Sequence, residues 1–192
     1  MFTQKIILAS QSPRRRELLN LAEINFEVIV ADTDESYPSG LSFEEIAIHI
    51  AKNKALAITS QGKVDNIIIA ADTIVVCDGE VIGKPINEED AVNIISKLSG
   101  NKHSVITGVY MVQKTKEFFF AYVTDVTFHH LTQTQIQYYV NKYKPFDKAG
   151  AYAIQEWIGA VGIKNINGDF YNVMGLPISR VVAALVEFEV KN

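Results

Sequence analysis

Hydrophobic and polar positions along the chain follow two periods, one typical of buried strands and one typical of helices with an apolar side. Short apolar runs at 6–9 and 66–71 contain mainly Ile and Ala and predict strands that are covered on both faces. The capping-box sequence Ser42-Phe-Glu-Glu45 opens a segment with an apolar residue every three or four positions, which predicts a helix to about Thr59. Further strands are expected at 26–30, 74–77, 80–82, 103–112, 118–128, 163–166 and 170–173, and further helices from Ser12-Pro13, from Asn87 to Gly100, from Thr132 and from Pro177 to about Glu187.

Two glycine-containing turns interrupt the alternation of helices and strands. Asp78-Gly79 and Asn167-Gly168 each separate two short strand-like runs, and such dipeptides tolerate the positive φ of a tight hairpin turn. Hairpins within a helix–strand alternation predict an α/β fold with a mixed central sheet flanked by helices. No repeat or long linker divides the 192 residues, so we expect residues 1–192 to form a single domain, with one lobe or two.

Composition and charge narrow the class of protein. Hydrophobic residues make up 48% and charged residues 21%, as in an ordinary globular domain. The net charge of −4 argues against a broad nucleic-acid-binding surface, so an anionic ligand would need a local cluster of positive charge. The single cysteine, Cys77, excludes an internal disulfide framework, and the apolar run near the N-terminus is too short for a signal peptide or a membrane span. We therefore expect a cytoplasmic protein without stable nucleic-acid or membrane partners.

A phosphate-binding helix start is the first candidate site. The segment Ala9-Ser-Gln-Ser-Pro-Arg-Arg-Arg16 leaves an expected strand and enters an expected helix. Helix N-termini favour phosphate through their main-chain N–H groups and partial positive charge, and here Ser10, Arg14 and Arg15 add further donors. The same pattern also fits a capped surface helix with solvated arginines.

A lysine and an aspartate stand in apolar surroundings. At 3.6 residues per turn, Lys54 lies on the same stripe as Ile50 and Ile58, whereas Lys52 points to the opposite side. Lys54 either extends past the edge of the core or reaches an anion in a cleft. Asp72 lies in an apolar run and is expected at the end of a buried strand, where it could hold a cation, orient water or cap a turn.

Two loops complete the candidates. Gly83-Lys84-Pro85 could bring a backbone and a positive charge close to an anion, but it also fits an ordinary loop and lacks the spacing of a P-loop. The segment 147–155 ends in Gln155, whose amide could read the edge of a nucleotide base. The histidines indicate no metal site, because His129-His130 are adjacent and His103 stands alone.

These motifs together resemble those of the Maf family, in order and over nearly the whole chain. The resemblance rests on Ser10-Gln-Ser-Pro-Arg-Arg15, Ala71-Asp-Thr73, Gly83-Lys-Pro85, Asp147-Lys-Ala-Gly-Ala-Tyr152 and Gln155. It implies an α/β fold of two lobes with a cleft, similar to inosine triphosphate pyrophosphatases. It also implies a house-cleaning enzyme that hydrolyses dTTP and UTP to the monophosphate and pyrophosphate, with Mg²⁺ or Mn²⁺ as cofactor.

The resemblance also implies a role for individual residues. By position, Asp72 matches the family's catalytic acid, and Glu35 fits the acidic segment linked to metal binding. The positions of the triphosphate-binding groups are occupied by Ser10, Arg14, Arg15, Lys54 and Lys84, and those that mark the dTTP/UTP branch by Arg15, Thr73 and Gln155. With Glu35, Asp72 is also a candidate metal ligand. Asn53 departs from the family, which often has Glu there. The alternative function is a regulator of septum formation that binds a partner or senses nucleotides, and the sequence leaves a homodimer open.

Overall fold

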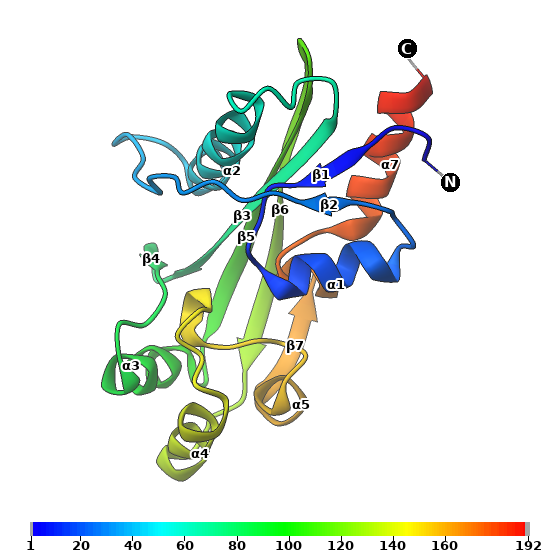
Figure 1. The fold of residues 1–192 in the computed structure, drawn as a ribbon. Coiled ribbons are helices and arrows are strands. Elements are labelled where there is room, and N and C mark those ends of the chain that lie inside the picture. Colours follow the sequence, from blue (N-terminus) through cyan, green and yellow to red (C-terminus); the bar gives the residue numbers. More distant parts are fainter. Residues whose placement is uncertain (1, 191–192) are drawn as a thin grey trace. The chain divides into compact units, whose positions relative to one another are not determined.

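The computed structural model describes residues 2–190, and Figure 1 shows their arrangement. The elements in chain order are β1 (Ile6–Leu8), α1 (Pro13–Leu21), β2 (Glu27–Val28), α2 (Phe43–Thr59), β3 (Ile67–Cys77), β4 (Glu80–Ile82), α3 (Glu88–Leu98), β5 (Lys102–Gln113), β6 (Lys116–Phe128), α4 (Gln133–Tyr143), the 3-10 turn η1 (Ala149–Ala151), α5 (Trp157–Gly162), β7 (Ile163–Asn167), α6 (Phe170–Met174) and α7 (Ile178–Val190).

The strands form one sheet with both parallel and antiparallel pairs. Its seven strands follow the order β2-β1-β3-β5-β6-β7, with β4 attached to β3. β1 is parallel to β2 and to β3, and Ile7 lies opposite Glu27 on one side and Ile68 on the other. β4 is antiparallel to β3, and β7 is antiparallel to β6. This confirms the predicted mixed α/β fold.

Contacts divide the described chain into two compact units. The first contains residues 2–72, 107–122 and 175–190, and the second contains residues 73–106 and 123–174. The three long strands β3, β5 and β6 each contribute residues to both units.

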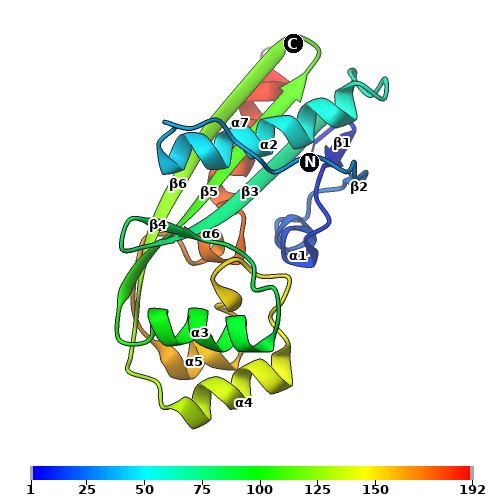
Figure 2. The ribbon, with the colours of Figure 1, turned by 90° about the vertical axis from the view of Figure 1, so that its left-hand side faces the viewer.

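The core of the first unit lies where α2 packs against the sheet. A Cβ atom on Gly108 of β5 would lie 2.3 Å from the main-chain carbon of Ala47, so only glycine allows this close approach. α7 lies on the opposite face of these strands from α2 (Figure 1, Figure 2). A cluster of fully or almost fully buried side chains fills the α2 side: Ile7, Ala9, Ala51, Ala55, Ile58, Ile68, Ala70, Tyr110 and Val112.

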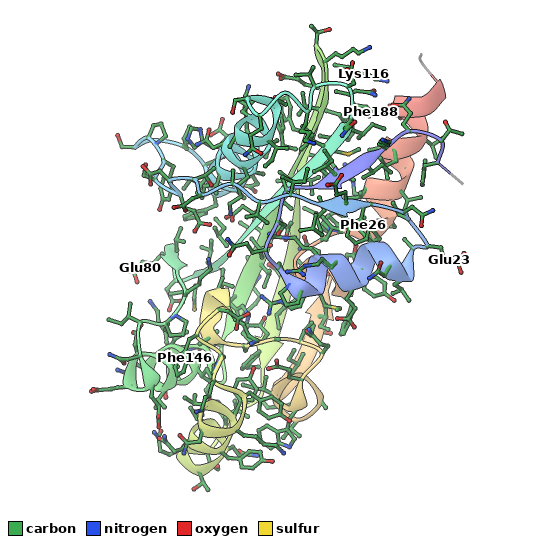
Figure 3. All side chains as sticks on the ribbon, in the orientation of Figure 1. Glu23, Phe26, Glu80, Lys116, Phe146 and Phe188 are labelled. Atoms are coloured by element: carbon green, nitrogen blue, oxygen red, sulfur yellow. The ribbon has the colours of Figure 1, made fainter. Side chains whose placement is uncertain are left out.

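The last turn of α7 is tied to the start of β6. Lys116 donates hydrogen bonds to the main-chain oxygens of Glu187 and Phe188, at 3.1 and 3.2 Å. Its ammonium also lies 4.5 Å from the centre of the Phe188 ring (Figure 3). A cation at this end complements the negative end of the helix dipole and binds carbonyls that the helix itself leaves without partners.

The second unit is built around the other halves of the long strands. In it α3 contacts α4 and η1, and α5 contacts β7. Asn172 of α6 is fully buried and donates hydrogen bonds to the main-chain oxygen of Val105 and to the hydroxyl of Thr124, both at 3.0 Å. This buried amide fixes α6 against β5 and β6.

Most of the predicted elements are confirmed, because short-range signals control where they begin. The predicted capping box forms at Ser42 before α2, and the helix expected from Thr132 begins there as α4, with a capping box that the structure adds. Asp78 and Gly79 adopt positive φ angles of 53° and 76° and close the predicted hairpin between β3 and β4. Within the described residues, no helix is both long enough and apolar enough to cross a bilayer.

Three expectations about elements are wrong. β3 is continuous from Ile67 to Cys77, so Asp72 lies in the middle of a strand and not at its end. The run at 170–173 is helical, because Asp169 accepts a hydrogen bond from the main-chain N–H of Tyr171 at 2.7 Å and so starts α6. The expected hairpin between 163–166 and 170–173 does not form, and β7 pairs with β6. The short helix α5 was not expected at all.

Candidate active site

The turn from β1 into α1 places Ser10 at the start of the helix. Ser10 is buried, and its hydroxyl oxygen accepts hydrogen bonds from the main-chain N–H of Ser12 (3.2 Å) and from the guanidinium of Arg15 (3.0 Å). A hydroxyl has two acceptor lone pairs and one donor proton, so both acceptor positions are used and the proton is left to donate. Pro13 occupies the first turn as predicted, but the side chain of Ser12 makes no capping hydrogen bond.

Arg15 is a buried cation beside this turn. Its Nε donates to the main-chain oxygen of Gly175 at 2.8 Å, which ties α1 to the segment that leads into α7. Burial lowers the pKa of Arg15, the charge of Asp72 raises it, the neighbouring Arg14 lowers it and Glu35 raises it. Burial is the largest of these effects, so the pKa of Arg15 lies below its ordinary value although two carboxylates oppose the shift.

Lys54 lies between two carboxylates. Its Nζ is 2.6 Å from Oδ1 of Asp72 and 2.7 Å from Oε1 of Glu35. The side chains of Lys54 and Asp72 are 17% and 13% exposed, whereas that of Glu35 is 49% exposed. Lys52, two positions earlier, points elsewhere and forms a long 3.8 Å ion pair with Glu117. The predicted helical phase of α2 is therefore confirmed, and Lys54 offsets the cost of placing Asp72 inside a buried strand.

A polar turn precedes α2 and carries Glu35. Both carboxylate oxygens of Asp34 accept from Ser36, one from its main-chain N–H at 2.9 Å and one from its hydroxyl at 2.6 Å. These hydrogen bonds lower the pKa of Asp34. The turn fixes the main chain on both sides of Glu35, so this exposed residue reaches Lys54 from a defined loop position.

In the second unit, a main-chain hydrogen bond to the Gly83 loop and ion pairs of a buried lysine help to hold the segment 147–156. The N–H of Gly150 donates to the carbonyl of Gly83 at 3.2 Å, which joins two of the predicted motifs. Gly150 has a φ of 70°, and a Cβ there would lie 3.0 Å from the side chain of Val75, so both the backbone angle and the close contact favour glycine. Lys148 is buried and forms ion pairs with Asp147 at 2.7 Å and with Glu156 at 3.6 Å.

The remaining predicted residues of the second unit are more accessible. Lys84 and Gln155 are exposed, and Thr73 is partly buried on β3. The structure thus brings together Ser10 with Arg15, and Lys54 with Glu35 and Asp72, and it joins the Gly83 and Gly150 loops. The sequence did not indicate the Gly175 carbonyl as a partner of Arg15, because 160 residues separate them. Nor did it indicate that His103 pairs with Tyr152, at 2.8 Å.

Comparison with known proteins agrees with the motifs. The profile of the family described as Maf-like protein matches residues 5–188. A protein of Cytophaga hutchinsonii named dTTP/UTP pyrophosphatase is 51% identical over 94% of this chain and 82% of its own length. A protein of the same name from Phocaeicola vulgatus is 50% identical over 94% of each chain.

A solved structure shows only a distant likeness. The nucleoside-triphosphatase / dITP/XTP pyrophosphatase of Mycobacterium abscessus is 14% identical, covers 66% of this chain and 75% of its own, and has a TM-score of 0.39. At these values the likeness adds nothing to the assignment. The family profile and the two relatives, each similar over more than nine-tenths of this chain, are sufficient by themselves. The chain belongs to the Maf-like proteins.

Proposed function

We propose that this protein hydrolyses dTTP and UTP to the monophosphate and pyrophosphate, and so removes these nucleotides from the cellular pool. The observation that carries the proposal is the cluster of the first unit, in which Lys54 contacts Asp72 and Glu35 while Arg15 contacts Ser10. A nucleoside triphosphate is polyanionic, and hydrolysis needs both cations to offset that charge and a carboxylate to handle water. The names of the two relatives support the same reaction and the same substrates.

The carboxylates of Glu35 and Asp72 fit a divalent cation. Both place an oxygen within 2.7 Å of one nitrogen, so they converge on a position that a cation already occupies. Among residues 2–190, no group of three or more His, Cys, Asp or Glu side chains could hold a metal by itself. Two carboxylates completed by substrate phosphates are typical of Mg²⁺. Asn53 adds no charge, because an amide is neutral, and its side chain contacts His49 along α2 at 3.1 Å.

The residues of the first unit supply most of the proposed chemistry. We assign Ser10, Arg14, Arg15 and Lys54 to the triphosphate, where a hydroxyl donor and three cations offset the negative charge. Asp72 orients the water that attacks the α-phosphorus and accepts its proton. The bond from the α-phosphorus to the bridging oxygen breaks, and pyrophosphate leaves. A bound Mg²⁺ or Mn²⁺ would supply further positive charge to the phosphate oxygens.

The residues of the second unit complete the proposal. We assign Lys84 to the phosphates as a point charge, and Thr73 and Gln155, with Arg15, to the choice of base. A uracil or thymine ring offers a carbonyl and an imide N–H, which the two ends of the Gln155 amide can pair. Cytosine has an amino group in place of one carbonyl, so one end of the Gln155 amide would be covered by the bound base without a hydrogen-bond partner. Such a base is rejected.

The proposed substrates also indicate the cellular compartment. We propose that the protein acts in the cytoplasm, where nucleotide pools are used. We further propose that both units belong to one domain, because three strands contribute residues to each.

A nucleotide panel tests the function. Pyrophosphate release is measured with dTTP, UTP, CTP and GTP at saturating Mg²⁺ or Mn²⁺. We expect the highest specificity constants for dTTP and UTP. A preference for GTP would refute the proposed substrate, and tight binding of UTP without any turnover would indicate the nucleotide sensor instead.

A further inference from the structure

Two buried aromatic side chains hold the segment Tyr152–Glu156, which carries Gln155. Residues 151–154 are all buried, and Gln155 is the first exposed residue after them. Its side chain therefore projects from a main chain that is fixed by its neighbours. Both contacts described next lie within the second unit.

His103 holds the start of this segment. It is 2% exposed on β5, and its Nε2 lies 2.8 Å from the hydroxyl of Tyr152. Both rings also meet Phe128 edge to face, with ring centres 5.2 and 5.0 Å apart. Burial lowers the pKa of His103 to about 4, so the imidazole is neutral near pH 7 and can accept a hydrogen bond from the phenol. Three packed rings thus fix the direction of Tyr152.

Tyr139 holds the end of the segment. It is fully buried on α4, and its hydroxyl accepts a hydrogen bond from the main-chain N–H of Ala153 at 3.2 Å. The same hydroxyl donates to the carboxylate of Glu156, which also pairs with Lys148. The phenol of Tyr139 therefore bridges Ala153 and Glu156, which lie on either side of Gln155.

The backbone just before the segment is strained. Ala151 has a φ of 58°, in the left-handed region that residues with a Cβ seldom adopt. Such a conformation persists only where the surrounding contacts fix it, and it is concentrated at ligand-binding sites. Here the main-chain N–H of Ala151 donates to the carbonyl of Lys148 at 3.0 Å, and the contacts of Tyr152, Ala153 and Glu156 hold the chain that follows.

We propose that His103 and Tyr139 are positioning residues for base selection, which hold the segment Tyr152–Glu156 so that Gln155 meets the base in one orientation. The inference rests on the proposed function, because it acts through Gln155. Neither residue touches the nucleotide in this proposal. Loss of either contact should therefore reduce the preference for UTP over CTP and leave recognition of the phosphates intact.

The experiment compares matched variants in the full-length enzyme. Tyr139→Phe removes a single oxygen and keeps the buried ring, His103→Leu removes the partner of Tyr152, and His103→Gln restores a polar end. Each is made alone and together with Gln155→Ala, and Tyr171→Phe on the exposed side of α6 is the control. The readouts are the ratio of kcat/KM for UTP to that for CTP, and the inhibition constant of inorganic tripolyphosphate.

We expect Tyr139→Phe and His103→Leu to lower the UTP/CTP ratio about three- to tenfold, the value of one hydrogen bond. His103→Gln should recover part of this loss, and no variant should lower the ratio further once Gln155 is Ala. Tripolyphosphate inhibition should stay unchanged throughout. If Gln155→Ala lowers the ratio but Tyr139→Phe and His103→Leu do not, positioning is refuted and base reading stands.

Two other results would also overturn the inference. If Gln155→Ala leaves the ratio unchanged, base reading itself fails and positioning fails with it. Equal losses for UTP, CTP and tripolyphosphate would mean that the two residues only support the fold. Thermal melting identifies any variant that loses structure. If His103→Leu does not fold, Tyr139→Phe still tests the inference, because it removes only one oxygen.

Discussion

Replacing Lys54 by Met should strengthen the binding of Mn²⁺ to the nucleotide-free protein. The ammonium of Lys54 lies 2.6 Å from Asp72 and 2.7 Å from Glu35, so a metal ion at these carboxylates must first displace it. Methionine replaces the apolar part of the lysine side chain up to Cε but removes the competing ammonium. The same change should weaken the binding of triphosphates, because it removes a cation that we assign to the phosphates.

The expected magnitude follows from the exposure of the two ion pairs. The pair with Asp72 is largely covered, with side chains 17% and 13% exposed, and we assign it about 1.5 kcal/mol. Glu35 is 49% exposed, and solvent screening reduces its pair to about 0.5 kcal/mol. Removing about 2 kcal/mol of competition corresponds to a roughly thirtyfold lower Kd for Mn²⁺.

Titration with Mn²⁺, followed by electron paramagnetic resonance without nucleotide, measures this change. Lys52→Met is the matched control, since Lys52 lies on the same helix but forms a long 3.8 Å ion pair with Glu117 and lies over the ring of Tyr110. Its Kd should equal that of the wild type. Lys54→Arg keeps a cation and should also stay near the wild-type value. Equal or weaker Mn²⁺ binding by Lys54→Met would refute the idea that Lys54 and the metal compete for one position.

Four further predictions concern turnover, base choice, backbone strain and pH. Asp72→Asn should lower kcat by at least about a hundredfold with little change in nucleotide binding, and near wild-type turnover would remove the acid–base role. Gln155→Ala should narrow the gap between the specificity constants for UTP and CTP by about 1–3 kcal/mol, and an unchanged gap would exclude base reading. Gly150→Ala should lower the free energy of unfolding in urea by about 2–3 kcal/mol, because φ is 70° and a β3 side chain lies 3.0 Å from the added Cβ. Gly62→Ala, with φ of 82° and open space around it, should cost only the backbone part, so equal losses would argue against the close contact. Burial lowers the pKa of His103 to about 4, so the residue is neutral in the folded protein near pH 7. Its unfolded pKa is about 6.5, so the stability that it contributes is fully present above that pH and is lost as the pH falls toward 4. His103→Gln should therefore remove up to about 3 kcal/mol of the pH dependence of unfolding in this window, and parallel curves for wild type and variant would contradict it.

The sequence by itself determined the elements whose signals are local. The capping box at Ser42, the helix start at Thr132 and the turn at Asp78-Gly79 each depend on residues within a few positions of one another. They can therefore be inferred from spacing alone. The orientation of side chains around α2 can also be inferred locally, because a period of 3.6 residues per turn places Lys52 and Lys54 on opposite sides of the helix. Motifs and family resemblance supplied the candidate residues, whose roles stay predictions.

Only the tertiary structure decided where long-range contacts override the local pattern. An aspartate within an apolar run suggested a strand end, but β3 continues through Asp72 because Lys54 from another element neutralises it. Asn167-Gly168 suggested a hairpin, but the run after it is helical, and β6 is the strand that pairs with β7. The contact of His103 with Tyr152 joins positions 49 residues apart. Such contacts form only when folding buries both partners, and for this reason no periodicity or spacing in the sequence marks them.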